Sequence, residues 1–596
     1  MISLGIDIGG TGAKCVAFDE NGTQKAISYV EYPLEAGMVN LPQQILTDSI
    51  EKVIADCVKT LSDPKEVAAI TVSSFGESFA AVDKDGASLG DIILYFANAE
   101  NAEFDELVRK VGPEKFMRIA RILPDASYSL AKMLYTKKIA ERPVWKFLFV
   151  AGFVCYKLCG NPICDVSLAC RSLLYDVQKQ DWSDELLEAS GITRDELPEV
   201  LPTGGIAGKL LPDVADKMGL STDVTVVIGS HDQIVNALGA GVSGIGEAVD
   251  VAGTCECIEP LYASIPESLD FQKLNFACVP YFTTGGYVTY AYNISAGSVV
   301  RWYRDFLKEL LNKQGENSLN LYDLFNEVCP DEPTDITVLP FLQGMGGTPD
   351  VSPYATGTFF GVTTATRIGD IYRAILEGVT FEMRYNQEKL AENGIKIDRL
   401  YACGGGARSQ KWLQVKADIL GCDIIPTSSE ETGAMGSAIL GFAAVTGKDK
   451  FEMAKKFAGY RDTVYPNPEN MKKYDDIAKE LQNIEYMPLI EPSINEEGMA
   501  NAQLRTLYND KEIRFTVDGK TVDKDDDLFV EPHALEDRLL PREKIHEIAH
   551  YRDNVVEILA FRRRFEHFDE VRDHDVLPSR TDERHRTVKI EQCGGK

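Results

Sequence analysis

The sequence contains no apolar run long enough to cross a membrane. A membrane-spanning helix needs about 20 consecutive apolar residues, and the longest apolar stretch, from Phe147 to Cys155, is shorter than that. The N-terminus, which reads MISLGIDIGG, lacks the basic and apolar regions of a signal peptide. These absences predict a protein of the cytoplasm that has no membrane partner.

Basic residues are scarce relative to acidic ones. The 596 residues include 62 Lys and Arg against 92 Asp and Glu, which gives a formal net charge of −30. Such a surface disfavours nucleic acid and anionic membranes as partners, although it leaves room for a local basic pocket. Hydrophobic residues make up 44% of the chain, which is enough to form ordinary buried cores.

The sequence also has no paired C-x-x-C motif among its 13 cysteines. Most of them lie in apolar contexts, where a thiol packs as a small hydrophobic group. One irregular cluster contains Cys155, Cys159, Cys164 and Cys170. We interpret it as a set of buried thiols, with a metal site as the alternative.

Histidine is nearly absent before the last part of the chain. Only His231 precedes residue 490, whereas the other six histidines follow it. The last 106 residues include 43 charged ones, while the preceding 490 include 111. This change in composition predicts a boundary near Ile490–Pro492. Together with an internal repeat of architecture, it predicts domains at 1–242, 243–490 and 491–596.

The last predicted domain contains one motif that could bind a metal ion. Residues 546–550 read HEIAH, and on a helix His546 and His550 would lie one turn apart with Glu547 beside them, as a zinc site requires. The flanking residues are charged, which is typical of a solvated amphipathic helix. We therefore predict a helix over Arg542–Arg564, and we keep a fused metal-dependent module as an alternative. A strand is predicted at Glu512–Val517.

Apolar strand-like runs alternate with helical patterns over the first 490 residues, which predicts an α/β fold. Each half begins with a strand that runs into a Gly-Thr turn, which indicates duplicated architecture around a cleft. The predicted strands include Ser3–Ile8, Cys15–Asp19, Val67–Ser73, Val224–Ile228, Glu247–Val251 and Leu400–Ala402. The predicted helices include Lys132–Ile139, Trp145–Leu158 and Ile368–Lys389.

The first candidate motif is GIDIGGTGAK at residues 5–14. A buried strand delivers the Asp7 carboxylate to a glycine turn, where the backbone could approach a phosphate closely. Asp7 could hold magnesium through water. The alternative is a plain hairpin turn. The motif is not a Walker sequence, because the G-x-x-x-x-G-K-[ST] spacing is absent.

The second motif is VVIGSHDQ at residues 226–233. A strand ends there, and Asp232 emerges at the start of a small-residue helix. Asp232 could accept the proton of a hydroxyl that attacks phosphorus, because orientation matters more than an unusual pKa in phosphoryl transfer. The alternative is a carboxylate that caps the helix.

Two further glycine motifs lie in the second half. Residues 252–256 read AGTCE, which resembles the first turn without its Asp, and residues 404–407 read GGGA after a predicted strand. Glycines in these places permit close approach of phosphates or of a flat ligand. A small-residue helix start at 432–438 suits close packing against a turn or a nucleotide. The alternative in each case is an ordinary turn.

Taken in order, these motifs resemble the FGGY carbohydrate kinases of the actin–hexokinase superfamily. The resemblance extends over about residues 1–475. Further segments that carry it are DVSLA at 165–169, LYD at 174–176, Trp182, LPFLQG at 339–344 and RAILEGV at 373–379. It implies two actin-like (ribonuclease H-like) α/β domains that flank a catalytic cleft, with the C-terminal extension left unassigned.

The resemblance also implies a cofactor set and residue roles. ATP and Mg²⁺ would bind, Asp7 would associate with the metal, and Asp232 would be the catalytic base. The ATP-binding residues implied are Thr11, Gly12, Gly253, Thr254, Gly297, Gly404, Gly405, Gly406 and Ala407. The substrate would be a small sugar or polyol, with a ketopentose favoured. A homodimer is one option for the assembly.

The acceptor site departs from the familiar members of the family. Glu77 aligns with the Glu of the glycerol-kinase form, but Gly76 stands where that form has Arg. Residues 96–100 read FANAE where many members have W-x-D-x-R. The predicted substrate-binding residues are Glu77, Phe96, Asn98, His231 and Asp232. These departures keep open a non-catalytic relative that binds nucleotide or sugar as a sensor or scaffold.

Overall fold

The computed structural model describes residues 1–34, 37–97, 102–282, 286–312 and 320–483, together with five short strands after residue 488. The chain divides into two compact units, Met1–Asp475 and Asp476–Lys596. Within the described residues, no helix is both long and apolar enough to cross a membrane.

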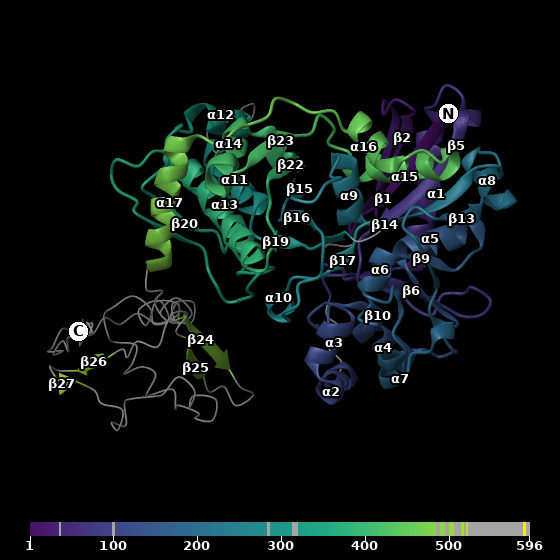
Figure 1. The fold of residues 1–596 in the computed structure, drawn as a ribbon, viewed down its shortest axis with the longest axis horizontal. Coiled ribbons are helices and arrows are strands. Elements are labelled where there is room, and N and C mark those ends of the chain that lie inside the picture. Colours follow the sequence, from purple (N-terminus) through teal and green to yellow (C-terminus); the bar gives the residue numbers. More distant parts are fainter. Residues whose placement is uncertain are drawn as a thin grey trace, which may run out of the picture. The chain divides into compact units, whose positions relative to one another are not determined.

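The first lobe of the larger unit is built on a six-stranded sheet with the order β13-β14-β5-β1-β2-β3 (Figure 1). β1 and β14 both run parallel to β5, whereas β2 pairs antiparallel with β1. The strands are β1 (Ile2–Ile8), β2 (Gly12–Asp19), β3 (Gln24–Glu31), β5 (Val67–Ser74), β13 (Ile206–Lys209) and β14 (Thr225–His231).

The second lobe repeats this plan on a seven-stranded sheet. Its order is β17-β18-β16-β15-β22-β23, with β19 also paired to β16. β16 is antiparallel to β15. β22 runs parallel to β15, and β23 runs parallel to β22. The main strands are β15 (Glu247–Ala252), β16 (Glu256–Tyr262), β22 (Arg399–Cys403) and β23 (Asp423–Pro426). The duplication predicted from the two Gly-Thr turns is therefore present in the sheets.

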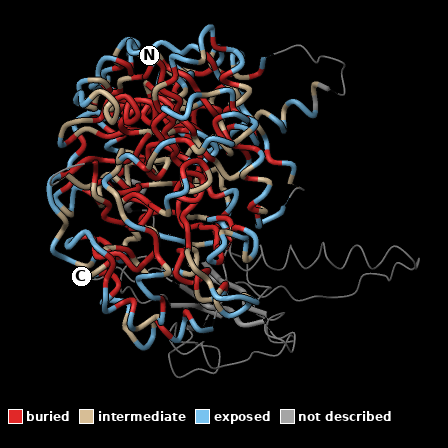
Figure 2. Tube along the Cα trace, turned by 90° about the vertical axis from the view of Figure 1, so that its right-hand side faces the viewer, coloured by how far each residue is buried: buried red, intermediate tan, exposed pale blue. Residues whose placement is uncertain are grey.

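Helices cover both faces of the first sheet, which explains why β1 and β5 are buried along nearly their whole length. Figure 2 shows the buried residues gathered inside the trace, with exposed residues around them. α1 and α5 pack on one face, and α9 and α15 pack on the other. The helices are α1 (Gln43–Lys59), α5 (Val150–Cys159), α9 (Asp232–Ala240) and α15 (Thr432–Thr446).

α15 comes from the second half of the sequence but packs on the sheet of the first lobe. The approach is so close that a methyl group on Gly5 would overlap the carbonyl oxygen of Ala434, and one on Gly436 would overlap that of Val235. The Ser73 and Ser437 hydroxyls are hydrogen-bonded at 2.9 Å. The sequence predicts close packing of residues 432–438 against a turn or a nucleotide. In the structure their close contacts are with β1 and α9, and these contacts join the two halves of the chain.

One predicted helix was partly wrong. The range Trp145–Leu158 splits into β8 (Lys146–Phe149) and α5. β8 pairs antiparallel with β6 (Phe79–Val82), far away in sequence. A continuous apolar run does not distinguish a buried strand from a buried helix, because both conformations bury every side chain.

The other elements agree with the sequence to within a few residues. The predicted helix Lys132–Ile139 is α4 (Ser129–Ile139), and Ile368–Lys389 is α13 (Ile368–Glu392). The four clustered cysteines, Cys155, Cys159, Cys164 and Cys170, are all buried thiols. Among the residues that the structure describes, no group of three or more His, Cys, Asp or Glu side chains could hold a metal ion.

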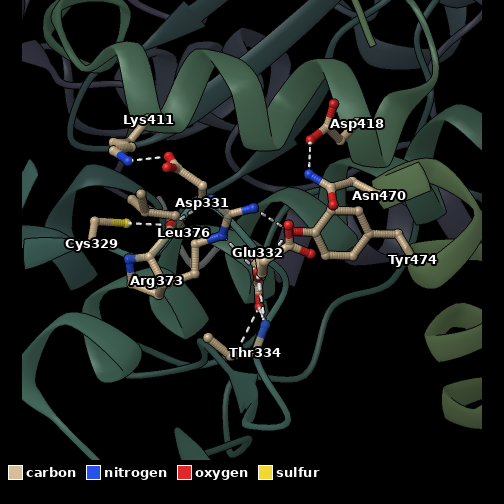
Figure 3. A network of polar contacts seen from close by, with 12 residues as sticks. Cys329, Asp331, Glu332, Thr334, Arg373, Leu376, Lys411, Asp418, Asn470 and Tyr474 are labelled. Atoms are coloured by element: carbon tan, nitrogen blue, oxygen red, sulfur yellow. Dashed lines mark hydrogen bonds and ion pairs between the residues drawn. The ribbon is translucent and has the colours of Figure 1, made fainter. Parts of the chain in front are cut away.

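A buried polar network holds α13 against the first part of α17 (Pro468–Asn483), the helix in which the larger unit ends (Figure 3). Arg373 Nη2 donates to the Tyr474 hydroxyl at 2.7 Å, and that hydroxyl donates to Glu377 Oε1 at 2.6 Å. Arg373 and Glu377 also pair directly at 2.8 Å. The Arg373 and Glu377 side chains are 1% and 4% exposed, so this cluster of charges lies in the protein interior.

Five short strands are described in the smaller unit. β24 (Leu489–Ile494) pairs with β25 (Ala500–Arg505), and β26 (Arg514–Val517) pairs with both β27 (Lys520–Thr521) and β28 (Val588–Glu591). β26 agrees with part of the strand predicted at Glu512–Val517. The predicted helix Arg542–Arg564, with His546, Glu547 and His550, lies outside the described residues.

Candidate active site

Three acidic side chains meet at one edge of the first sheet. Asp7 is the last residue but one of β1, Glu77 follows β5, and Asp232 follows β14. Because these three strands are parallel neighbours, their carboxyl ends lie at the same edge, with Asp7 opposite Ser73 and His231 opposite Ser74. The topology therefore brings together carboxylates that are far apart in the sequence: Asp7 and Asp232 are separated by 225 positions.

Asp232 is the first residue of α9, and its side chain is 25% exposed. Its Oδ1 accepts a hydrogen bond from the N–H of Gln233 at 2.7 Å. Burial, together with the nearby Asp7 carboxylate, raises the pKa of Asp232 to about 8. The residue that caps α9 is His231. The alternative that Asp232 itself is the helix cap is therefore wrong.

His231 lies between Asp232 and the second lobe. Its Nε2 is 3.4 Å from Asp232 Oδ1, and its Nδ1 is 3.1 Å from the hydroxyl of Tyr290. Burial lowers the pKa of His231 to about 4, so the ring is neutral near pH 7. Tyr290 belongs to the segment between β18 (Tyr287–Val288) and β19 (Ala291–Asn293). A side chain of the second lobe thus contacts the histidine beside Asp232.

Asp7 faces the start of α15. The Cβ of an alanine at Gly433 would be 3.4 Å from Asp7 Oδ2 and 3.2 Å from Asn236 Oδ1. Lys14, opposite Asp7 in the β1–β2 hairpin, forms an ion pair with Glu431 at 2.7 Å. Burial raises the pKa of Asp7, and Lys14 opposes that rise. The start of α15 is thus held against this carboxylate by charge and by close contact.

The first glycine turn carries Thr11, which is exposed, and Gly12, which is buried. A methyl group on Gly12 would be 2.6 Å from the carbonyl oxygen of Val30, so the hairpin accepts only glycine there. Gly10, in the same turn, faces two aromatic rings. A methyl group on it would be 3.2 Å from Tyr95 and 3.8 Å from Phe96. The predicted acceptor residue Phe96 therefore lies beside the first turn.

The corresponding edge of the second sheet carries the other glycines. Gly253 and Thr254 follow β15, and Gly404 follows β22, its parallel neighbour. A methyl group on Gly404 would be 2.7 Å from the carbonyl oxygen of Ala252, and one on Gly406 would be 2.6 Å from the Ala252 Cβ. Gly404 also has φ +79°, which favours glycine. The two segments are therefore one surface.

Gly297 completes that surface from a third direction. It begins α11 (Gly297–Asn312), and a methyl group on it would overlap the carbonyl oxygen of Gly253. The N–H of Ser298 donates to Thr254 O at 3.0 Å, and Arg301 Nη2 donates to Thr254 Oγ1 at 2.8 Å. In contrast, a methyl group on Gly405 would have no neighbour within 4 Å. Ala407 is buried below it.

Glu77 is buried and has φ +59°, an uncommon conformation for a residue with a side chain. It forms an ion pair with Arg171, which follows the short helix α6 (Val166–Cys170). Burial opposes ionisation of Glu77, but Arg171, His231 and Lys132 together outweigh it and hold the pKa of Glu77 below its usual value. The remaining predicted acceptor residue, Asn98, lies outside the described residues.

Sequence reasoning missed Arg171, Tyr95 and Tyr290. Arg171 directly follows the DVSLA segment and an apolar Cys170, so a charge in that context was the available signal. Tyr290 gave none, because its contact with His231 joins residues that are 59 positions apart. Tyr95 precedes Phe96, and both rings pack together with centroids 5.2 Å apart.

Comparisons with known proteins find relatives that span most of the chain. Xylulose kinase from Staphylococcus xylosus is 24% identical over 489 residues, which cover 80% of this chain and 97% of the relative. Gluconokinase from Bacillus subtilis is 28% identical, over 79% of this chain and 93% of the relative. The crystal structure of gluconate kinase from Lactobacillus acidophilus superposes with a TM-score of 0.72 at 21% identity, over 81% of this chain and 97% of that one.

Matches to whole domains define the family. Residues 2–239 match the N-terminal domain of the FGGY family of carbohydrate kinases, and residues 251–445 match the C-terminal domain. These ranges contain the two duplicated sheets and the glycine turns described above. The chain therefore belongs to the FGGY family of carbohydrate kinases, enzymes that phosphorylate sugars at the expense of ATP.

Proposed function

We propose that this carbohydrate kinase transfers the γ-phosphate of ATP to a hydroxyl of a ketopentose-like sugar, with Asp232 as the general base. The observation that carries the proposal is the meeting of Asp7 and Asp232 at one sheet edge. The two carboxylates are close enough for Asp7 to raise the pKa of Asp232. One carboxylate is then available for the phosphate end of the reaction, and the other for the acceptor hydroxyl.

The base has the chemistry that the reaction requires. Phosphoryl transfer has a loose transition state, so the main tasks are to hold the acceptor in line and to take its proton as the bond to phosphorus forms. Asp232 Oδ1 is fixed by Gln233, which leaves Oδ2 for the substrate hydroxyl. Neutral His231 adds a further contact beside Oδ1 without placing a positive charge there.

The residues around Asp7 suit magnesium, which prefers oxygen ligands and retains several of its waters. Asp7 offers a carboxylate whose burial disfavours the ionised form, so a nearby cation would stabilise it. When bound, Mg²⁺ would neutralise charge on the phosphates of ATP. In this proposal Asp7 holds the ion through water, and the Lys14–Glu431 pair fixes the neighbouring start of α15.

The glycine surface of the second lobe suits the phosphates and the nucleoside of ATP. Gly253 and Thr254 are exposed, and their turn is held by Gly297 and Arg301. Backbone N–H groups in this turn and in the Thr11–Gly12 turn would stabilise the charge on the transferring group. The free space at Gly405 would receive the nucleoside and its α-phosphate.

Two alanine substitutions separate the roles of these glycines. Gly405→Ala should leave thermal stability unchanged, since no atom lies within 4 Å of the added methyl group, but it should raise the KM for ATP at least about 10-fold by occupying space that ATP needs. Gly297→Ala should both destabilise the protein and weaken ATP binding, because the methyl group overlaps Gly253. Melting curves without and with ATP measure the stability of each variant and its ATP binding, and initial rates at varied ATP concentration measure the KM. An unchanged KM in Gly405→Ala would remove that segment from the ATP site.

The pKa of Asp232 gives a pH dependence with a definite sign. A base acts only when deprotonated, and burial together with Asp7 raises the pKa of Asp232 to about 8. At low Mg·ATP, we expect kcat/KM for the sugar acceptor to rise with pH and to level off above about pH 8. Saturating Mg·ATP should move the inflection to lower pH, because magnesium favours the carboxylate. A flat profile between pH 6 and 9 would contradict the assignment.

The acceptor is identified by an assay that couples ADP release to a panel of ketopentoses, ketohexoses, pentitols, glycerol and gluconate. Turnover with one or a few neutral sugars would support the proposal. The relatives named above act on xylulose or on gluconate, so a carboxylate-bearing acceptor is the specific rival. Phe96 and His231, with Glu77, are the described residues proposed to contact the acceptor. Absence of turnover with every compound would overturn the proposed function.

A further inference from the structure

A buried ion pair lies beside the proposed base. Two nitrogens of Arg171, Nε and Nη2, contact the same oxygen of Glu77, Oε1. The Arg171 and Glu77 side chains are only 12% and 11% exposed. Burial of an ion pair costs desolvation energy that the attraction between the two charges often fails to recover. Such a pair therefore contributes little to the stability of the fold. Its position at the acceptor end of the site suggests another use.

The guanidinium of Arg171 is held rigidly. It lies over the ring of Tyr128 at 4.9 Å and over the ring of Tyr290 at 5.1 Å, so aromatic faces flank it from both lobes. Its third nitrogen, Nη1, is buried and has no hydrogen-bond partner among the described residues. Because both contacts to Glu77 use Oε1, the pair also retains Glu77 Oε2. Arg171 Nη1 is therefore a buried donor without a partner, and Glu77 Oε2 is an acceptor that Arg171 does not use.

Gly76 places this pair against the base. The Cβ of an alanine at position 76 would be 3.0 Å from Arg171 Cγ and 3.0 Å from the ring of His231. Arg171 and His231 thus occupy the space that a side chain at position 76 would fill. Glu77 also contributes to the raised pKa of Asp232. An acceptor whose reacting hydroxyl meets Asp232 would present its other oxygens to Glu77 and Arg171.

The local charge disfavours an anionic acceptor. Glu77 neutralises Arg171, and Asp232 and Asp7 add negative charge nearby. The other cation at this end, Lys132, donates to the carbonyl oxygens of Glu77 and Leu94 at 3.1 and 3.2 Å, and burial lowers its pKa to about 8. Among the described residues at this end of the site, a substrate carboxylate would meet no unneutralised guanidinium. A pair of hydroxyls, in contrast, could donate to Glu77 and accept from Arg171.

We propose that Glu77 and Arg171 act as one neutral recognition unit that accepts uncharged polyhydroxy substrates, ketoses or polyols, and rejects aldonates. This inference rests on the sugar kinase function proposed above and narrows its substrate class. A site built to hydrogen-bond a hydroxyl discriminates strongly against a ligand that leaves its buried groups unpaired. The matched pair, and not either residue alone, then determines which acceptor is used.

The test compares the best neutral acceptor from the panel with D-gluconate, at saturating Mg·ATP. The wild type is expected to favour the neutral acceptor by at least about 100-fold in kcat/KM. Glu77→Gln leaves the Arg171 charge uncompensated, so this ratio should fall by about 100-fold, mainly through KM. Glu77→Asp keeps the charge and should restore the preference at a lower overall rate.

The control is Glu431→Gln, which removes a carboxylate from an ion pair on the Asp7 side of the site. It should leave the ratio between the two acceptors unchanged. A Glu77→Gln variant that is folded by circular dichroism and keeps the wild-type ratio would overturn the inference alone. A wild type that prefers gluconate would overturn both the inference and the ketopentose acceptor, while the kinase reaction itself would stand. No turnover with any acceptor would overturn the kinase proposal, and the inference would fall with it.

Discussion

Replacement of Asp232 by asparagine is expected to lower kcat about 1,000-fold, within the range of general base catalysis. The amide has nearly the same shape but does not accept the proton of the acceptor hydroxyl. The carbonyl oxygen of the asparagine can still accept a hydrogen bond from the Gln233 N–H, so α9 should still begin at residue 232. Binding of ATP, measured by titration calorimetry, should change little, because the proposed ATP residues lie on the other lobe and in the first turn.

Glu259→Gln provides a matched control for this substitution. Glu259, on β16, is a fully buried carboxyl group near Asp232, and burial holds its pKa well above the usual value. Both of its oxygens lack a hydrogen-bond partner among the described residues. Burial without a hydrogen-bond partner favours the uncharged form of Glu259, and glutamine mimics that form, so kcat should stay within about threefold. Equal losses in the two variants would indicate a general charge effect and would remove the special role of Asp232.

The parts of the site that the sequence predicted are those made by short segments. A strand that runs into glycines at residues 2–12 fixes its own conformation locally, and the turn at 252–256 does the same. The relation of Asp7 to Asp232 then follows from a rule of topology, since parallel neighbours expose their carboxyl ends at one edge. Expectations of this kind need only the order of the strands.

The parts that the sequence did not predict depend on contacts between distant segments. Arg171 meets Glu77 across 94 positions, and neither residue alone indicates the other. The wrong helix over Trp145–Leu158 has the same origin, because β8 exists through its pairing with β6. The packing of α15 on the first sheet could be predicted in kind from its small residues, but its partner could not.

Charged residues on α13 show this limit clearly. Arg373 and Glu377 are spaced i, i+4, which on sequence alone is typical of an exposed ion pair worth a few tenths of a kcal/mol. In the structure both are buried and share the Tyr474 hydroxyl; Figure 3 shows Arg373 and Tyr474 in this network. Thr334 Oγ1 donates to Glu377 Oε2 at 2.8 Å. The same spacing therefore serves a network that joins three segments of the second lobe.

Arg373→Met is expected to lower the free energy of unfolding of the larger unit by about 3–5 kcal/mol, because it leaves the Glu377 carboxyl group buried without its charge partner. Arg384→Met on the same helix is the matched control. Arg384 pairs with Glu388 at 3.0 Å and with Asp475 at 2.8 Å, and both acceptors are at least one third exposed. Its loss should therefore cost no more than about 1 kcal/mol. Urea unfolding followed by tryptophan fluorescence measures both variants.

The double variant Arg373→Met/Glu377→Leu separates two explanations of a large loss. If the loss of stability arises from an unpaired buried charge, removal of both charges should recover most of it. Two apolar side chains of similar volume can fill the same space without burying a charge. If the cost arises from the detachment of α17, the double variant should remain as unstable as the single one, because the Tyr474 hydroxyl has lost both partners. Recovery would show that the network serves to neutralise charge, whereas a persistent loss would show that it fastens the last helix to α13.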